Sequence, residues 1–525
     1  MTAKYKTPGV YIEEVNAFHN SILPVPTAIP AFIGYTPQAS YEGKSYFNIP
    51  TKISSFAEFK FIFCYPDAPA SAIPKQQYSP EYYLVKQKQK PIKGSCITIA
   101  GDFYAIVPDP NTIYYMYNSI RLFYENGGED AYIVSVGTYG CPSKTPMHPG
   151  DQIVNSNVQL NDLQNGIALL KKEQEPTMYI CPEATLLSVV NNATLMQSML
   201  FQNLEMQTAI SIFDVIGGRD PDPILYLDDI ETFRNNTGAR GLSFGCAYYP
   251  FIGTTMMQQT DIDFNSLFGG DLEQLEALLS LAENANQNIT KIFKMIRGLE
   301  DTNLTIEALN RALLTASPLY SLIIKETLIV ANMLPPSGAM AGVITTTDNQ
   351  EGVWKAPANT SIVGAVSLPI KLSSIDQAGL NVDAVSGKSI NAIRFFSGNS
   401  VLVWGARTLD GNSTDWRYIP VRRMLIFLEQ SCKLATKAFV FEPNDSNTWL
   451  VVKKMISNFL TSIWRQGGFQ GVTQEDAFFV RCGLNETMTN QDILNDNMIV
   501  SVGVSIVRPV EFIVFSFVIQ MKKSN

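Results

Sequence analysis

The stretch from Val401 to Asn444 constrains the fold most, because it combines the patterns of a strand, a turn and a helix in direct succession. It opens with the alternating residues VLVW and turns through the small polar residues LDGNSTD. Pro420 then stands where the first turn of a helix tolerates proline. Apolar residues follow at spacings of four, three, four and three, which predicts one buried helical stripe: Val421, Leu425, Leu428, Cys432 and Ala435. Such a block is typical of an α/β core.

The middle of the chain alternates between helical and strand patterns. Residues 160–250 predict an α/β domain with a mostly parallel sheet, and a first core strand is expected at 28–35. Residues 271–334 are expected to be largely helical, with breaks near Gly298 and Ser317. Residues 36–109 are polar and rich in Pro and Lys, including KQKQKPIK, so we expect a solvated surface insertion there.

Charge and hydropathy exclude several classes of function. The net charge is −9 without a long basic run, which argues against a nucleic-acid binder led by phosphate contacts. The N-terminus lacks the apolar core of a signal peptide, and no stretch reaches the roughly 18 apolar residues of a membrane span. We therefore expect a soluble chain made in the cytoplasm, with no membrane insertion.

Cysteine and histidine usage argues against disulfides, metals and cofactors. The seven cysteines are scattered and never form a CxxC pair, which predicts reduced, mostly buried thiols. With two histidines and no cysteine cluster, we expect no metal and no cofactor.

Three motifs resemble catalytic or ligand loops incompletely. Ser243 stands in a GxSxG pattern, but both histidines, His19 and His148, precede it, so the acid-then-histidine order of that motif cannot form. SGKS at 386–389 lacks the first glycine of a phosphate loop, because Val382 takes its place. Asp261 begins a calcium-loop pattern in which Ser266 replaces the turn glycine.

The adjacent carboxylates Asp228 and Asp229 stay open as acid/base groups, although surface charges are far commoner. No catalytic residue is expected from any of these patterns.

Both ends of the chain carry strand patterns with nothing local to pair with. Val10 and Ile12 alternate with polar neighbours, and Phe512–Ile519 is apolar on both faces apart from Ser516. An unpaired apolar strand is an aggregation hazard, so it needs a partner edge. From sequence alone, the ends pair either within their own subunit or with a neighbour by β-augmentation.

A predicted helix at 449–465 is amphipathic. Leu450, Ile456, Leu460 and Ile463 are expected to face the core, which leaves Lys453 and Lys454 elsewhere on the helix. DAFFVR at 476–481 predicts a strand after it.

Several motifs recur in an order that resembles contractile tail sheath proteins, the sheaths of phage tails, R-type pyocins and related injection systems. These motifs are TPGVYIEEV, PTAIPAFIGYT, PPSGAMAGV, EGVWKAPAN, WGARTL, YIPVRRM, FEPN, DAFFVR and VGVSIVRPVEFIVFSFVI. They cover about the first 36 residues and roughly 335–521. One departure is VSIV at 504–507, where the family usually shows Ala-Pro.

The resemblance implies an α/β fold with an α+β core, in which a sheath core domain built from both chain ends carries an inserted α/β domain and a variable outer insertion. The expected divisions are an N-terminal strand-donating arm at 1–24, inserted α/β structure at 25–345 with a surface insertion at 65–110, the core domain at 346–508, and a C-terminal arm at 509–525.

The resemblance also implies a structural subunit and no enzyme. Such subunits form hexameric rings stacked around an inner tube, which sheath contraction drives through a target envelope. The partners implied are other copies in a helical homo-oligomer, the inner tube protein, and baseplate and terminal cap proteins, with a recycling ATPase left open.

Residues that the resemblance places in the interlocking arms are Val10, Tyr11, Ile12, Val15, Phe512, Val514, Phe515, Phe517 and Val518. We further hypothesise that Lys453 and Lys454 face an acidic patch on the tube. A self-contained α/β binding module and a serine hydrolase using Ser243 are the alternatives. A phage tail, an extracellular particle and a type VI-like apparatus all stay open.

Overall fold

The computed structural model describes residues 21–65, 80–282, 287–299, 304–396 and 401–511. It divides into two compact units, each described here by itself. The described part of the small unit comprises residues 21–25 and 427–507, and that of the large unit comprises 26–426 and 508–511. The arm residues expected at 10–15 and 512–518 lie outside the described residues.

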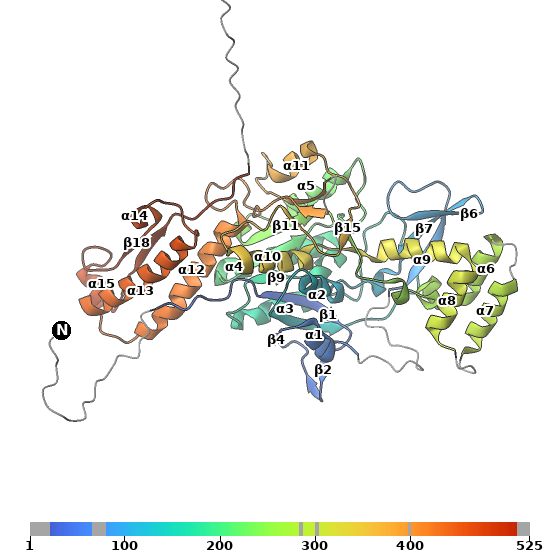
Figure 1. The fold of residues 1–525 in the computed structure, drawn as a ribbon, viewed down its shortest axis with the longest axis horizontal. Helices are drawn as coiled ribbons and strands as arrows, with labels where there is room; N and C mark the ends of the chain where they lie inside the picture. Colours follow the sequence, from blue (N-terminus) through green and yellow to red (C-terminus); the bar gives the residue numbers. More distant parts are fainter. Residues whose placement is uncertain (1–20, 66–79, 283–286, 300–303, 397–400, 512–525) are drawn as a thin grey trace, which may run out of the picture. The chain divides into compact units, whose positions relative to one another are not determined.

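A nine-stranded sheet organises the large unit (Figure 1). Its central pairs are parallel, and the antiparallel strands lie at its two edges. Its strands in spatial order are β14 (Thr360–Ser361), β17 (Val401–Val403), β16 (Asn391–Phe395), β11 (Gly245–Tyr249), β10 (Ile210–Asp214), β9 (Met178–Ile180), β1 (Pro30–Thr36), β8 (Ala131–Thr138) and β4 (Thr51–Ile53). The predicted helix–strand alternation and the mostly parallel sheet are confirmed.

Helices cover both faces of this sheet, which explains why every residue of β1 is buried. Phe32 points to one face, where its ring lies 5.6 Å from that of Phe123 in α2 (Met116–Glu125). Its neighbour Ile33 points to the other face and packs so closely on Gly166 of α3 (Leu160–Leu169) that a Cβ there would clash.

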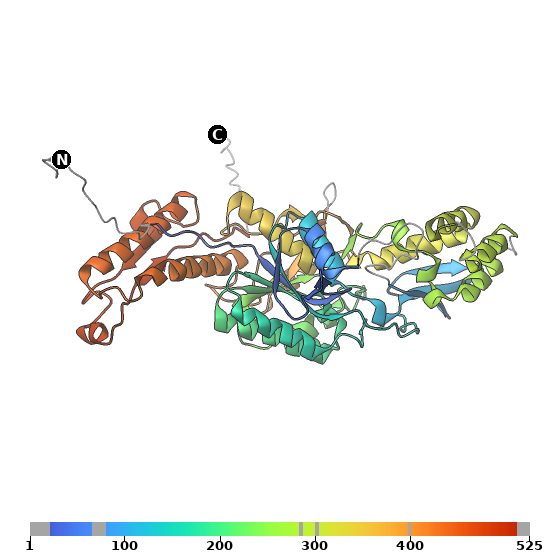
Figure 2. The same ribbon diagram turned by 90° about the horizontal axis from the view of Figure 1, so that it is seen from below.

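The remaining helices of these layers are short to medium in length. α10 packs beside α2, and α4 beside α3 (Figure 2). Their bounds are α1 (Phe56–Phe63), α4 (Val189–Met206), α5 (Tyr226–Asn236), α10 (Ser337–Glu351) and α11 (Ser374–Asn381).

The segment expected to be a polar surface insertion forms ordered structure with its own apolar side. After the short strands β2 (Ser40–Tyr41) and β3 (Lys44–Ser45), an antiparallel sheet contains β5 (Tyr82–Gln87), β6 (Cys96–Ile99) and β7 (Asp102–Pro108). Tyr82, Ile97 and Ile106 are buried. The sequence did not predict these buried positions, because the lysines of the β5–β6 loop dominate the composition of the segment.

Four helices follow, as the pattern of residues 271–334 predicts: α6 (Leu272–Ala282), α7 (Gln287–Arg297), α8 (Ile306–Ala316) and α9 (Pro318–Ala331). Within the described part of the chain, no single helix is long and apolar enough to cross a membrane. Only α8 and α9 taken together pass that test of length and composition, across a bend of 116°. A small antiparallel sheet contains β13 (Met333–Leu334), β12 (Ile252–Thr254) and β15 (Ala365–Ser367). Its strand β13 follows α9 in the chain.

α12 (Ile419–Thr436) starts in the large unit and ends in the small one. Its predicted apolar stripe is only partly correct. Val421 and Leu428 are buried, whereas Leu425, Cys432 and Ala435 are half-buried. The first turns are buried nearly all round, so that Arg422 and Arg423 are buried as well.

The small unit also contains α13 (Ser446–Arg465), α14 (Gln474–Ala477), β18 (Phe478–Arg481), α15 (Asn490–Leu494) and β19 (Ser501–Val504). The prediction that Leu450 faces the core is wrong, since its side chain is 66% exposed. Val452, Met455 and Phe459 join the predicted Ile456, Leu460 and Ile463 on the buried face. The strand expected from residue 476 begins at Phe478, because Thr473 caps a helical turn over 474–477.

Candidate functional site: an open sheet and two anchored chain ends

The small unit contains a sheet of only two strands. β18 and β19 are antiparallel, with Phe478 opposite Val504 and Arg481 opposite Ser501. Among the described residues neither strand has a second partner, so each presents one open edge of backbone N–H and C=O groups. A two-stranded sheet is marginally stable by itself, and such an edge is a template for another strand.

The two faces of this sheet differ in character. Phe478 and Val480 are buried, and β18 packs against α13. On the other face the Phe479 ring covers Gly503, where a Cβ would clash with it, and the Arg481 guanidinium lies 4.7 Å from the same ring. The side chains therefore order the sheet, and its edges stay available.

Hydrogen bonds hold the first described residues of the chain in place, and each bond lies within a single unit. In the small unit, the Val25 N–H donates to Ser431 Oγ at 3.2 Å. In the large unit, Arg423 Nη2 donates to the Thr27 carbonyl at 2.9 Å, and the Ile29 N–H donates to Thr177 Oγ1 at 2.9 Å.

Arg423 also forms a buried ion pair with Asp348 of α10. The two contacts measure 2.7 Å and 2.5 Å, and the side chains are 3% and 1% exposed. A pair this deep depends on good geometry to offset the cost of desolvation, which its bidentate form supplies.

A second arginine holds the last described residue. Arg407 donates from Nε and Nη2 to the two carboxylate oxygens of Glu511, at 2.9 Å and 2.5 Å. Its third nitrogen donates to the carbonyls of Asn381 and Gly411. Arg508 adds a bond of 2.9 Å to the Thr414 carbonyl. The chain is thus anchored immediately before residue 512.

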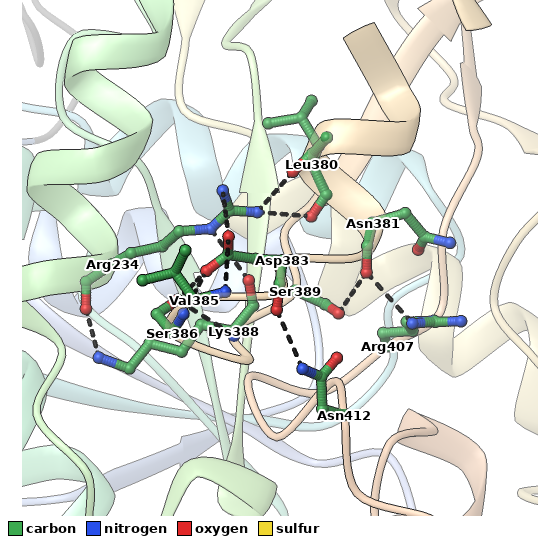
Figure 3. A network of polar contacts seen from close by, with 11 residues as sticks. Arg234, Leu380, Asn381, Asp383, Val385, Ser386, Lys388, Ser389, Arg407 and Asn412 are labelled. Carbon is green, nitrogen blue, oxygen red and sulfur yellow. Dashed lines mark hydrogen bonds and ion pairs between the residues drawn. The ribbon is translucent and has the colours of Figure 1, made fainter. Parts of the chain in front are cut away.

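The end of α11 and the loop after it, residues 379–389, shape this anchor (Figure 3). Asn381 presents its carbonyl to Arg407 and to the Ser389 hydroxyl, while Asp383 accepts from the Ser386 N–H at 2.7 Å. Arg234 of α5 donates to the carbonyls of Leu380 and Lys388.

The same contacts explain the SGKS motif. Lys388 is buried and donates to the Arg234 carbonyl, and burial lowers the pKa of its ammonium group. Because its ammonium group is bound by the chain itself, the motif forms a structural loop and offers no phosphate site.

The environment of Ser243 is unsuited to nucleophilic catalysis. Its Oγ accepts from Arg422 Nη2 at 2.8 Å, and the guanidinium lies 3.7 Å from the Trp416 ring and 4.2 Å from that of Phe244. Arginine cannot accept the serine proton. The turn also leads into strand β11, the reverse of the strand-to-helix order of a nucleophile elbow.

The carboxylates of the calcium-like motif cap short turns. Asp261 accepts from the Gln258 N–H at 2.7 Å, and Asp263 accepts from the Asn265 N–H at 2.7 Å. Four of the seven cysteines are buried: Cys64, Cys181, Cys246 and Cys482.

Lys453 and Lys454 both lie on α13. Lys453 is half-exposed and pairs with Glu486 of the same unit at 3.5 Å, and Lys454 is exposed. The tube-facing role assigned to them therefore stays a prediction.

Sequence reasoning missed the three buried arginines Arg407, Arg422 and Arg423. The available signal was a charged residue inside an otherwise apolar stretch, as in WGARTL and YIPVRRM. Buried arginine must be paired, so these positions predict partners, although not which ones.

Comparisons with known proteins agree with one another. Residues 412–520 match the family model described as phage tail sheath C-terminal domain. A tail sheath protein of Vibrio phage KVP40 is 28% identical over 189 residues, which are 35% of this chain and 26% of that protein. The chain therefore covers about a quarter of that relative's length.

Solved structures match over nearly the whole chain. The sheath of an extracellular contractile injection system, PVC, in its contracted state is 23% identical over 98% of both chains, with a TM-score of 0.57. The contracted helical sheath of the anti-feeding prophage is 24% identical over 98% of this chain and 99% of that one, also with a TM-score of 0.57. A chain of the six-fold symmetrised baseplate of the same prophage is 25% identical over 98% and 100%, with a TM-score of 0.55. The predicted α/β fold class is confirmed.

Proposed function

We propose that this chain is a contractile tail sheath protein, which its ordered motifs, its match to the sheath C-terminal domain and its fold support, and that it polymerises into a sheath by exchanging terminal strands between copies. The observation that carries this proposal is the two-stranded sheet of the small unit, with an open edge on each strand. The alternating segment at residues 10–15 and the apolar segment at residues 512–519 are of strand length and composition.

The anchors make such an exchange mechanically useful. A strand that binds a neighbour transmits force only if its base is fixed to its own subunit. Arg423 with Asp348 fixes the chain at Thr27, and Arg407 fixes it at Glu511. Neighbouring copies then stay connected while other contacts between them change.

The proposed assembly consists of hexameric rings stacked around an inner tube, with a baseplate at one end and a cap at the other. Among the matched structures, a six-fold symmetrised baseplate and sheaths in the contracted state support a baseplate partner and a contracting sheath for their own proteins. In this proposal, contraction repacks the interfaces between copies and drives the tube through a target envelope. Lys453 and Lys454 are the proposed tube contacts, and no catalytic step is required.

Negative-stain electron microscopy of the full-length chain, alone and with its tube protein, tests the proposal. We expect striated cylinders or stacked rings. Deleting residues 1–18 or 512–525 should abolish them, since either deletion removes one proposed strand and leaves both anchors in place.

A proline at position 514 is the finer variant, because it removes a backbone donor from the proposed strand without shortening the chain. Val514→Pro should prevent assembly, whereas Ser524→Pro, outside the apolar segment, should not. Normal cylinders from either deletion would show that the interlocking-strand model is wrong. Uniform monomers from the intact chain would favour the self-contained binding module instead.

A further inference from the structure

The large unit contains a cavity of about 270 Å³ that the assembly proposal does not use. It lies beyond the carboxyl end of β10, whose last residue is Asp214, and Ile216, Gly217 and Arg219 form part of its lining. The N-terminal turns of α4 and the middle of α5 complete that side. In open parallel sheets, ligands bind in crevices at this end of the strands.

Two opposite charges line the cavity without neutralising each other. Lys93 and Asp229 are both half-buried. In the described part of the chain, neither side chain forms a hydrogen bond or an ion pair. Burial raises the pKa of the Asp229 carboxyl above its ordinary value, and the charge of Lys93 opposes part of this shift.

The other charges at the cavity are already compensated or solvated. Arg219 donates to Asp220 at 3.1 Å and to the Val330 carbonyl at 3.2 Å, and Asp151 is exposed. Part of the wall is apolar, formed by Tyr115, Ile153, Met196, Phe233 and Phe251. A ligand would therefore meet one cation, one anion and an apolar surface.

We propose that this cavity binds a small zwitterion of the free amino acid class. The ligand carboxylate would lie at Lys93, its ammonium group at Asp229, and an apolar side chain on the aromatic wall. The volume suits a molecule of this size and is small for a nucleotide, since pockets for drug-sized ligands usually exceed about 300 Å³. Two half-buried charges with no partner of their own would each gain one from such a ligand.

Lys93 belongs by sequence to the run KQKQKPIK, which predicts only solvated charges. In the structure Lys93 is half-buried and lines the cavity, whereas Lys88 and Lys90 of the same run are exposed. The proposal is independent of sheath assembly, and either can fail without the other.

Isothermal titration calorimetry on the full-length chain tests the proposal with phenylalanine, leucine and glutamate as probes. We expect phenylalanine or leucine to bind more tightly than glutamate, whose second carboxylate has no partner on the apolar wall. Phenylpropionate, which lacks the ammonium group, and phenethylamine, which lacks the carboxylate, should each bind at least about tenfold more weakly than phenylalanine.

Two variants remove one charge at a time. Lys93→Met and Asp229→Asn should each weaken binding of the amino acid by roughly tenfold or more. Their matched controls, Lys90→Met in the same run and Asp228→Asn beside Asp229 on α5, should change it by less than about twofold. The proposal is overturned if no amino acid of the panel binds saturably below about 10 mM. Equal binding by a single-charge analogue, or binding unchanged in both cavity variants, would also overturn it.

Discussion

The large and small units complete their sheets in different ways. In the large unit, nine strands lie beneath helices on both faces, and the buried charges Arg423 and Asp348 satisfy each other. In the small unit, the sheet has two strands, of which β18 packs on α13, and both outer edges lack a partner in the described chain. Apolar side chains such as Leu450 and Val472 are exposed there.

This difference separates a self-sufficient scaffold from a region that depends on assembly. A nine-stranded sheet with a continuous core accounts for its own stability. A two-stranded sheet does not, so its stabilisation must come partly from added strands. Changes in the large unit should therefore alter folding, whereas changes in the small unit should alter association.

The largest effect is expected from Arg423→Met, which leaves Asp348 buried without its partner. The free energy of unfolding should fall by about 3–5 kcal/mol in urea titrations. Adding Asp348→Leu should restore much of it, because a buried pair replaced by apolar groups is often nearly neutral. Arg311→Met, at an exposed ion pair with Glu307, is the control and should cost less than about 1 kcal/mol. Equal losses in both arginine variants would contradict the self-sufficient large unit.

A pH-dependent effect is expected at Glu183, which is fully buried after β9. Burial raises the pKa of its carboxyl to about 8, against the Met116 N–H that donates to it at 2.9 Å. The folded state thus holds a proton that the unfolded state releases near its ordinary pKa of about 4.3. Stability should fall as pH rises between these two values, by up to roughly 5 kcal/mol.

Glu183→Gln should remove this contribution and leave a stability that falls less from about pH 5 to about pH 9. Some fall should persist, because burial also raises the pKa of Asp214 to about 7. Urea unfolding at several pH values measures the slope, and a variant with the wild-type slope would refute the assignment.

A local effect is expected from Glu511→Gln at the C-terminal anchor. The change preserves shape but removes the charge that Arg407 binds, which should cost about 1–3 kcal/mol locally. Amides at 505–511 should exchange hydrogen faster, while those of β1 and β10 should not change. Glu475→Gln, in the capped turn before β18, is a control that should leave these amides unaffected. Uniformly faster exchange would mean that the contact supports the whole unit.

The smallest effect on stability is expected from charge reversal at Lys453 and Lys454. Lys453 pairs with Glu486 near the surface, so losing this pair should cost less than about 1 kcal/mol. If the proposed tube contact is correct, Lys453→Glu with Lys454→Glu should still impair co-assembly with the tube protein. Unchanged co-sedimentation with the tube would remove these lysines from the interface.

The sequence predicted most of the large unit because its periodicity is strong. Strands such as β10 and β11 are short, mostly apolar runs between helical patterns, and both lie within residues 160–250, where alternating helices and strands were expected. The three-stranded sheet containing Tyr82 was not predicted, because this segment has few buried positions and its composition is dominated by charged loops.

Features that depend on contacts between residues far apart in the chain could not be predicted from the sequence. Leu450 matches the helical period, yet it is exposed because the buried face of α13 is centred on Val452 and Phe459. Nothing local indicates that Arg407 would meet Glu511, 104 residues later. Strand patterns at both ends are visible in the sequence, whereas the open edges of β18 and β19 required the structure.

Hydrogen exchange at the edges of β18 and β19 tests the central claim most directly. The assembled full-length chain would be compared with the unassembled Val514→Pro variant, following peptides that cover 478–481 and 501–504. Added strands should protect amides of both peptides on assembly, while amides of β1 and β10 in the large unit stay unchanged. Equal exchange of the edge peptides in the two samples would contradict the account, because assembly would then not complete this sheet.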